Sequence, residues 1–255
     1  MSIPNFVVNN LSAVQGKRIK IVGGIDTSIE ECPYLTSLQH ESNNLHLCTG
    51  SIIAHQYILT TAHCVMEPFV SFKDLRIHVG TNNTSSGKGL WYLPEKYFSH
   101  PMFSITKNEK VKHANDISII KLYGYIEFNK YQNKINLPTT NILTAEIGTI
   151  SGWGANTYPS YYASNILKKV SMTTIDTDNC QNYVPFAINS DQFCAYYKKG
   201  SGPCIGDSGA PLVKDSTTLI GILTLSIPCG TGAPDLYTNV YNHLGFIKSV
   251  LREDD

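Results

Sequence analysis

Short apolar runs recur along the chain, and clusters of Gly, Pro, Asn and Ser separate them. The runs are rich in Ile, Leu, Val, Thr and Tyr and show no long helical period, which is typical of β-strands bounded by turns. Many short strands at nearly regular spacing favour a barrel or a sandwich over alternating strands and helices. The predicted strands occupy residues 35–40, 51–61, 75–80, 116–124, 148–154, 167–175 and 217–225.

One helix is predicted near the C-terminal end, over about residues 242–252. Its apolar residues recur at spacings of three and four, and Asn242 is suited to cap its first turn. The polar segment from Leu137 to Thr144 is the predicted boundary inside the chain. A chain of 255 residues can form one large domain or two closely packed small ones.

Charge and hydropathy exclude several classes of partner. Basic and acidic residues number 20 each, so the surface gives no reason to expect nucleic acid or a membrane as a partner. No apolar run approaches the roughly eighteen residues of a membrane-spanning helix. The N-terminal stretch lacks the apolar core of a signal peptide. Any secretion signal is therefore expected to be missing from this chain.

Seven cysteines are many for a cytosolic chain of this size. They could be free thiols, metal ligands or disulfides. No two of them are spaced as C-x-x-C, which argues against a zinc ribbon. Disulfides formed in an oxidising compartment are the favoured interpretation, and they imply a secreted, extracellular protein.

Three residue contexts point to nucleophilic chemistry when they are taken together. Ser208 lies in "GDSGAP", where the glycines permit a sharp turn that exposes the hydroxyl. A serine needs a base beside it and donors for the oxyanion that it generates. His63 ends an apolar run in "LTTAHC", and Asp116 begins another in "NDISIIKL". Each alone would be a turn serine, a packed histidine or a strand-end acid, but all three in one chain favour a catalytic set.

The motifs "IVGG" at Ile21, "LTTAHC", "NDISIIKL", "SGWG", "GDSGAP" and the C-terminal helix follow one another in the order of the trypsin/chymotrypsin family. From Ile21 to about Arg252 the chain resembles a serine protease of that family. The cysteine in "ECPY" is similar to one in the mite group 3 trypsin-like allergens and their paralogues. The resemblance implies an all-β fold of two antiparallel six-stranded barrels with a C-terminal α-helix. It divides the chain into a propeptide at 1–20 and a peptidase domain at 21–255. Within that domain the barrels would span about 21–135 and 136–240, and the helix 242–252.

By the same resemblance, Ser208 is the nucleophile, His63 the general base and acid, and Asp116 the residue that orients His63. The N–H groups of Gly206 and Ser208 would form the oxyanion hole. The active site would lie in the cleft between the barrels. The function implied is a secreted serine endopeptidase that works through an acyl-enzyme on protein or peptide substrates.

The family is made as an inactive precursor, so "KRIK" before Ile21 implies cleavage after Lys20 by an activating protease. The new ammonium of Ile21 would then pair with Asp207. Because a buried charge without its partner is costly in free energy, the formation of this pair can act as a switch. The resemblance also implies three disulfides, which pair Cys48 with Cys64, Cys180 with Cys194, and Cys204 with Cys229. Cys32 is left over, and a small buried thiol is its favoured interpretation.

The substrate pocket departs from the family pattern. Gly202, followed by Pro203, stands where a trypsin has an acid, and Asp235 stands where a glycine usually lines the same pocket. The ledge that binds substrate backbone reads Thr224, Leu225 and Ser226. Asp235 could serve a basic side chain or fill the pocket. An alternative function is therefore a weak or inactive paralogue that binds other proteins.

The loop that holds calcium in the family has no carboxylate here, in "GTNNTSSGKG" at Gly80. We therefore expect no bound metal. We also expect no cofactor, and a monomeric protein. Asn82 and Asn83 are both acceptors for N-glycosylation on this loop.

Overall fold

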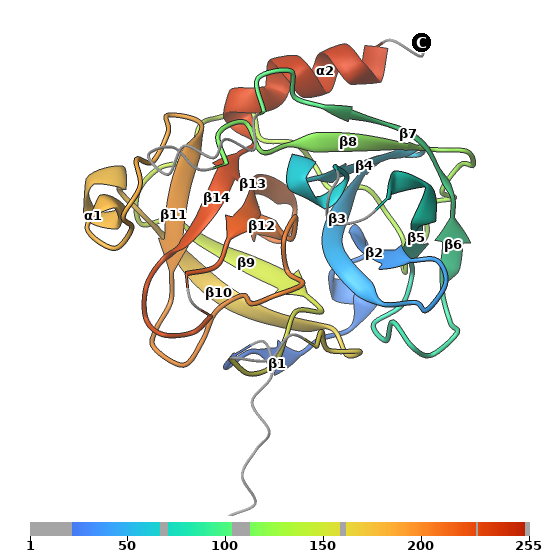
Figure 1. The fold of residues 1–255 in the computed structure, drawn as a ribbon, viewed down its shortest axis with the longest axis horizontal. Coiled ribbons are helices and arrows are strands. Elements are labelled where there is room, and N and C mark those ends of the chain that lie inside the picture. The colour runs from blue at the N-terminus through green and yellow to red at the C-terminus, as the bar shows by residue number, and fades with distance from the viewer. Residues whose placement is uncertain (1–21, 67–70, 104–112, 159–161, 228, 253–255) are drawn as a thin grey trace, which may run out of the picture.

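The structure is a computed structural model, and it describes residues 22–66, 71–103, 113–158, 162–227 and 229–252. Two curled antiparallel β-sheets lie side by side, and the C-terminal helix packs across one edge of the pair (Figure 1). None of the described helices is both long enough and apolar enough to cross a bilayer.

The first sheet has the strand order β6-β5-β2-β3-β4-β8-β7. Only Leu93 separates β6 from β7, so the two act as one bent strand that pairs with β5 at one end and β8 at the other. This bend closes a six-stranded barrel. Its strands are β2 (Leu35–His40), β3 (His46–Ala54), β4 (Tyr57–Thr60), β5 (Leu75–Val79), β6 (Leu90–Tyr92), β7 (Pro94–Ser99) and β8 (Ser118–Leu122).

The second sheet closes through the pairing of β10 with β9, which makes a ring of six strands. β1 adds to the outside of this ring through β10. The strands are β1 (Ile25–Asp26), β9 (Ile147–Gly152), β10 (Lys168–Ile175), β11 (Gln192–Tyr196), β12 (Pro211–Lys214), β13 (Thr218–Leu225) and β14 (Asp235–Asn239). The predicted all-β fold with two six-stranded barrels is confirmed.

The helices are short and lie outside the barrels. They are α1 (Thr177–Gln181), α2 (Leu244–Arg252) and the 3₁₀ turns Ile29–Glu31, Ala62–Cys64, Phe72–Asp74 and Tyr241–His243. The C-terminal helix was predicted in the right place, but Asn242 does not cap it. A 3₁₀ turn precedes Leu244, and the Asn242 side chain instead donates to the carbonyl of Ser190.

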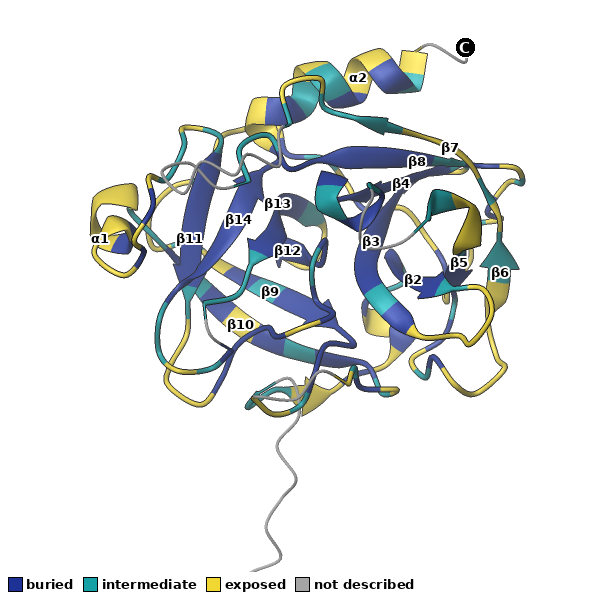
Figure 2. Ribbon diagram, in the orientation of Figure 1, coloured by how far each residue is buried: buried dark blue, intermediate teal, exposed yellow. Residues whose placement is uncertain are grey.

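Buried side chains fill both barrels and the seam between them (Figure 2). β10 shows the alternation that a barrel wall requires, because its inward side chains are buried and several that alternate with them are not. The seam joins Leu59 and Ile119 of the first barrel to Trp153 and Ile222 of the second, and Ile247 of α2 packs on the same cluster. Most predicted strands match observed ones, but the run at 51–61 was wrong as a single strand. It forms the end of β3, a turn, and β4.

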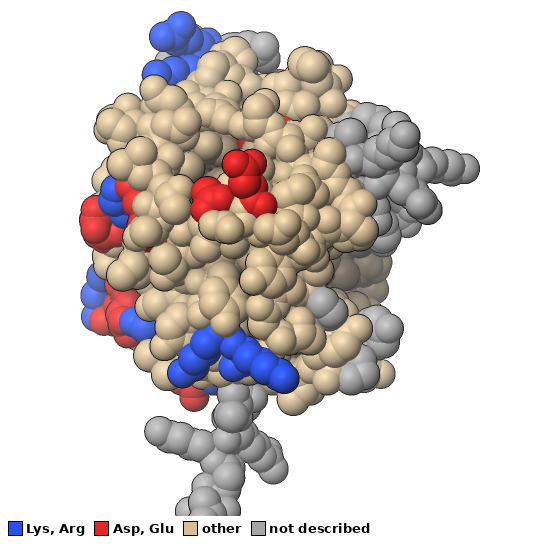
Figure 3. Space-filling model, turned by 90° about the vertical axis from the view of Figure 1, so that its left-hand side faces the viewer, with Lys and Arg blue, Asp and Glu red and all other residues tan. Residues whose placement is uncertain are grey.

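Charged side chains are sparse on the face that carries α1 and β11 (Figure 3). Acidic groups gather near its middle and basic groups lie towards its margins, in part beside further acidic groups, with mostly uncharged surface between them. This mixed pattern agrees with the balanced composition.

Candidate active site

A cavity of about 620 Å³ brings together residues of both barrels. His63 and Ser208 line the same cavity, although 145 positions separate them in the sequence (208 − 63). Its walls are more apolar than polar, as expected for a site that holds a peptide side chain. The lining residues are Leu47, Cys48, His63, Cys64, His113, Tyr158, Cys204, Ile205, Gly206, Ser208, Thr224, Leu225, Ser226 and Cys229.

Ser208 lies in a turn that only glycine can flank. Gly206 has φ +97° and Gly209 φ +79°, in the left-handed region. A Cβ at Gly209 would lie 2.2 Å from the carbonyl oxygen of Thr49, so the turn presses against β3. The amide of Thr49 in turn donates to the carbonyl of Ser208 at 2.8 Å. The second barrel therefore presents the serine while the first barrel fixes its backbone.

His63 lies in the 3₁₀ turn that follows β4, and Asp116 lies just before β8. Nδ1–H of His63 donates to Oδ2 of Asp116 at 2.6 Å, and the backbone N–H of His63 donates to Oδ1 at 3.0 Å. The Asp116 side chain has no exposed surface, whereas that of His63 is 17% exposed. Two hydrogen bonds from one residue fix the imidazole and leave Nε2 to accept a proton.

Electrostatics reinforce this pair. Burial alone would lower the pKa of His63, but the charge and hydrogen bond of Asp116 outweigh it and the net pKa is raised. Burial alone would raise the pKa of Asp116, but the nearby His63 and His113 hold that pKa well below its usual value. Asp116 is therefore a carboxylate at neutral pH, and it favours a protonated His63 when a proton arrives.

The Thr224 hydroxyl is linked to Asp116 through one other side chain. Oγ1 of Thr224 lies 2.8 Å from Oγ1 of Thr238. The Thr238 hydroxyl donates to the backbone carbonyl of Asp116 at 3.1 Å. The second barrel thus reaches the backbone of the acid, while the carboxylate is left to His63 and His113.

The peptide before Asp207 has a fixed orientation. Nε2–H of His46 donates to the carbonyl of Gly206 at 2.8 Å, and Nδ1 of His46 accepts from the Ser37 hydroxyl at 2.7 Å. Burial lowers the pKa of His46 to about 4, and the bond to Gly206 only partly opposes this. Among the hydrogen bonds of the described residues, none uses the N–H of Gly206 or Ser208 as its donor. Both amides are available to a ligand, as an oxyanion hole requires.

Asp207 is buried behind this turn. Its carboxylate accepts the N–H of Gly154 at 2.8 Å and that of Cys204 at 2.9 Å. Burial raises its pKa to about 6, although the two amides act against the rise. Lys20 and Ile21, the predicted cleavage site and ammonium donor, lie outside the described residues.

Some of the predicted pocket residues line the cavity and others do not. Gly202, Pro203 and Asp235 do not line it, whereas Thr224, Leu225 and Ser226 do. Asp235 is only 4% exposed, and burial raises its pKa well above the usual value against one hydrogen bond from the N–H of Ile227.

The three implied disulfides are present, and two of them wall the cavity. Cys48–Cys64 lies beside His63, and Cys204–Cys229 lies beside Ser226. Cys32 is a buried free thiol whose Sγ is 3.4 Å from the Ser151 hydroxyl, as expected for a small core residue.

Sequence reasoning missed Leu47, His113, Tyr158 and Ile205, which also line the cavity. Ile205 could have been found, because it lies inside the "CIGDSGAP" motif. Tyr196 and Tyr197, which lie a few positions before Gly202 in the sequence, do not line it. Tyr196 borders a different cavity, and Tyr197 is 42% exposed.

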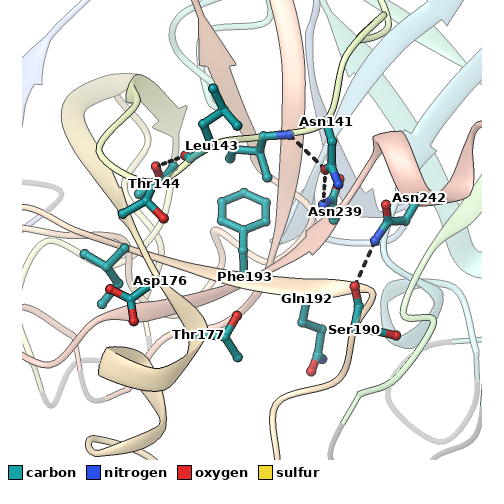
Figure 4. A pocket seen from close by; sticks show the side chains of 13 residues that line it. Asn141, Leu143, Thr144, Asp176, Thr177, Ser190, Gln192, Phe193, Asn239 and Asn242 are labelled. Carbon is teal, nitrogen blue, oxygen red and sulfur yellow. Dashed lines mark hydrogen bonds between the residues drawn. The ribbon is translucent and has the colours of Figure 1, made fainter.

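A second cavity, of about 270 Å³, lies between the segment 141–144, α1 and the start of β11 (Figure 4). Its walls are mainly amide and hydroxyl side chains around the ring of Phe193. Several of these groups are already paired, including Asn239 with Asn141 and Asn242 with Ser190. It holds no residue pair suited to nucleophilic catalysis, so the cavity between the barrels is the candidate active site.

Comparisons with known proteins identify the family of the chain. The family described as Trypsin matches residues 21–247. A trypsin of Phaedon cochleariae is 31% identical over 228 residues, which are 87% of this chain and 84% of that protein. Chymotrypsin-2 of Vespa crabro is 29% identical, with 89% of this chain and 98% of that protein covered.

Among solved structures, mouse neuropsin, a serine protease of the limbic system, superposes with a TM-score of 0.80. It is 25% identical, and the match covers 89% of this chain and 98% of neuropsin. The narrower likeness to mite allergens remains a prediction. With its motifs, barrels and family match in agreement, the chain belongs to the trypsin family of serine proteases.

Proposed function

We propose that this protein is a secreted serine endopeptidase that is made as a precursor and activated by cleavage after Lys20. The observation that carries the proposal is the contact of 2.6 Å between His63 and the buried Asp116, on a cavity that Ser208 shares. Extracellular location is supported by three disulfides, which persist in oxidising compartments.

In the proposed reaction, Oγ of Ser208 attacks the carbonyl carbon of the scissile peptide while Nε2 of His63 takes its proton. The oxyanion is stabilised by the N–H groups of Gly206 and Ser208. His63 then gives the proton to the leaving amine, and an acyl-enzyme remains. A water molecule, deprotonated by His63, hydrolyses the ester and restores Ser208.

Activation depends on Asp207. Its carboxylate is buried with two amide donors, and burial favours its neutral form. An ammonium at Ile21 would favour the charged form and hold the Gly206–Ser208 turn in place. Proteolysis after Lys20 would thus stabilise the oxyanion hole.

The test is labelling with a small fluorophosphonate before and after cleavage at Lys20. We expect the label on Ser208 only after cleavage, and none in a cleaved Ser208→Ala control. A small ester should be hydrolysed by the same cleaved protein, and Ile21→Gly should blunt that activity. Equal labelling of cut and uncut chains would contradict the activation step, and no labelling of either would contradict the enzyme.

The pocket supports a second candidate function. Asp235 is buried, and neither it nor Gly202 lines the cavity. A long substrate side chain at the primary site therefore has restricted room. A protein that labels at Ser208 but cuts no peptide of a library would be a paralogue that binds other proteins.

A further inference from the structure

His113 brings a second imidazole to the His63–Asp116 pair. Its Nδ1 lies 3.4 Å from Oδ2 of Asp116, the same oxygen that accepts from His63. The two imidazole rings meet edge to face, with centroids 5.6 Å apart. His113 is three residues before Asp116, so the loop that supplies the acid also supplies this ring.

The loop is held in an unusual conformation that directs the ring inward. His113 has φ +58° and Asn115 φ +54°, which costs a non-glycine residue roughly 1 kcal/mol or more each. Contacts from the second barrel oppose this cost. Nε2–H of Gln192 donates to the His113 carbonyl at 2.9 Å, and the N–H of Asn115 donates to Asp191 at 2.7 Å. The ring position is thus fixed by tertiary contacts.

Two imidazole nitrogens and one carboxylate oxygen form a ligand set that Zn²⁺ prefers. The donor atoms of His63, His113 and Asp116 all lie within 4.8 Å of one another. In tetrahedral coordination with bonds of about 2.0 Å, ligand atoms are roughly 3.3 Å apart. The His113–Asp116 distance of 3.4 Å already fits, and the His63–Asp116 distance of 2.6 Å would need to lengthen by roughly 0.7 Å.

The site is open to an ion from one side. His63 and His113 line the cavity, with side chains 17% and 30% exposed, while Asp116 is closed off behind them. A fourth ligand, a water molecule, would approach from the cavity side. The other ligand group among the described residues, Cys48, Cys64 and His63, is no rival because its two cysteines form a disulfide.

We propose that His63, His113 and Asp116 form an inhibitory site for Zn²⁺. In the free protein the neutral His63 carries its proton on Nδ1. Zn²⁺ binds Nδ1 of His63 and Nδ1 of His113, so the proton that each Nδ1 directs at Asp116 leaves to water while each Nε2 takes one up from water. Both rings stay neutral, but Nε2 of His63 now carries a hydrogen and cannot accept the proton of Ser208. Zn²⁺ therefore fixes the tautomer that cannot act as a base, without blocking the rest of the cavity.

Binding is tested without relying on activity, by equilibrium dialysis of ZnCl₂ against the full-length Ser208→Ala chain. We expect one ion per chain at this site, bound about tenfold or more weakly after His113→Ala. His40→Ala is the matched control, since His40 lies at the far end of β2 and contacts Ser42, and it should bind as the parent does. Equal binding with and without His113 would overturn the proposal, as would no binding to the parent.

A variant that fails to fold is recognised by its circular dichroism, and ¹¹³Cd NMR of the parent then decides. A shift typical of nitrogen and oxygen ligands supports the site, and its absence refutes it. The inhibition itself rests on the proposed protease function. Zn²⁺ should inhibit ester hydrolysis in the range where it binds, and EDTA should restore the rate. Binding without hydrolysis would refute the protease, whereas labelling at Ser208 without binding would refute only the zinc site.

Discussion

Nε2 of His46 donates a hydrogen bond to the carbonyl of Gly206 across 2.8 Å. His46 belongs to β3 of the first barrel, whereas Gly206 belongs to the nucleophile turn of the second. One buried, neutral imidazole therefore ties the two barrels together at the Gly206–Asp207 peptide, which lies between the two N–H groups, of Gly206 and Ser208, that would stabilise the oxyanion. Docking of the barrels and the orientation of this peptide are coupled.

Replacing His46 by Phe should uncouple the orientation of the Gly206–Asp207 peptide from the docking of the two barrels. The Gly206 carbonyl would lose its shorter buried hydrogen bond and keep only the long one from the Thr49 hydroxyl at 3.4 Å, which costs about 1–3 kcal/mol, and the peptide could rotate. We expect kcat of the activated protein on a small ester to fall by about tenfold or more, with little change in KM. His46→Gln keeps a donor and should retain more of the rate than His46→Phe. Wild-type kcat in His46→Phe would contradict this role.

As the pH rises from about 4 to about 6, the uncut chain should become less stable because of Asp207. Its pKa of about 6 in the folded state exceeds the ordinary 3.8, so the folded chain holds more protons in this window and unfolding becomes easier as pH rises. The full effect is about 3 kcal/mol in the free energy of unfolding. Urea unfolding of a Lys20→Ala chain should show this loss, and the same chain with Asp207→Asn should not. Parallel pH profiles for the two chains would rule it out. After cleavage the loss should shrink, because an ammonium partner lowers the pKa.

Local pattern was enough to predict much of the fold. The run at Leu35–His40 has the bounds of β2, and strand-forming residues between turn formers mark β10 and β13 equally well. The Gly–Asp–Ser–Gly turn could also be predicted, because its conformation depends on glycines within it. The run at 51–61 was mistaken because His55 and Gln56 turn the chain without a glycine or proline.

Features that depend on distant partners could not be predicted. His113 reaches the His63–Asp116 pair because Gln192, 79 positions away, holds its carbonyl. The Asp235 carboxyl group accepts a hydrogen bond from the Ile227 amide in the loop before β14, and the apolar side chain of Ile227 gives no sign of that contact. Thr224 acts through Thr238, which no local motif identifies. Such contacts depend on how the barrels pack. The sequence contains both partner residues of each contact but does not indicate that they pair.

The proposed triad should behave as one unit. Ser208→Ala and His63→Ala should each reduce kcat of the activated protein by roughly 10⁴-fold or more. Because each residue acts only through the other, the double variant should be little worse than either single one. Single-turnover kinetics with an active-site titrant would measure the three rates. Additive losses would mean that the two side chains act independently, and residual peptidase activity in Ser208→Ala would indicate another nucleophile.

Asp235 should give a weak, pH-dependent preference for Arg or Lys at the primary site. Its carboxyl is neutral over an extended pH range, because burial raises its pKa well above the usual value. A basic side chain would have to ionise it, and Gly202 supplies no second acid at the floor. The ratio of kcat/KM for Arg over Phe substrates should therefore rise with pH in the activated wild-type protein. In Asp235→Asn the ratio should be flat with pH, since no carboxylate forms.

Asp235→Gly should lower the Arg/Phe ratio by roughly tenfold or more, the scale of one hydrogen bond to a charged group, and should admit aromatic side chains. A peptide library cleaved strictly at Arg and Lys, or an Asp235→Gly profile like that of the wild type, would place the specificity elsewhere in the cavity.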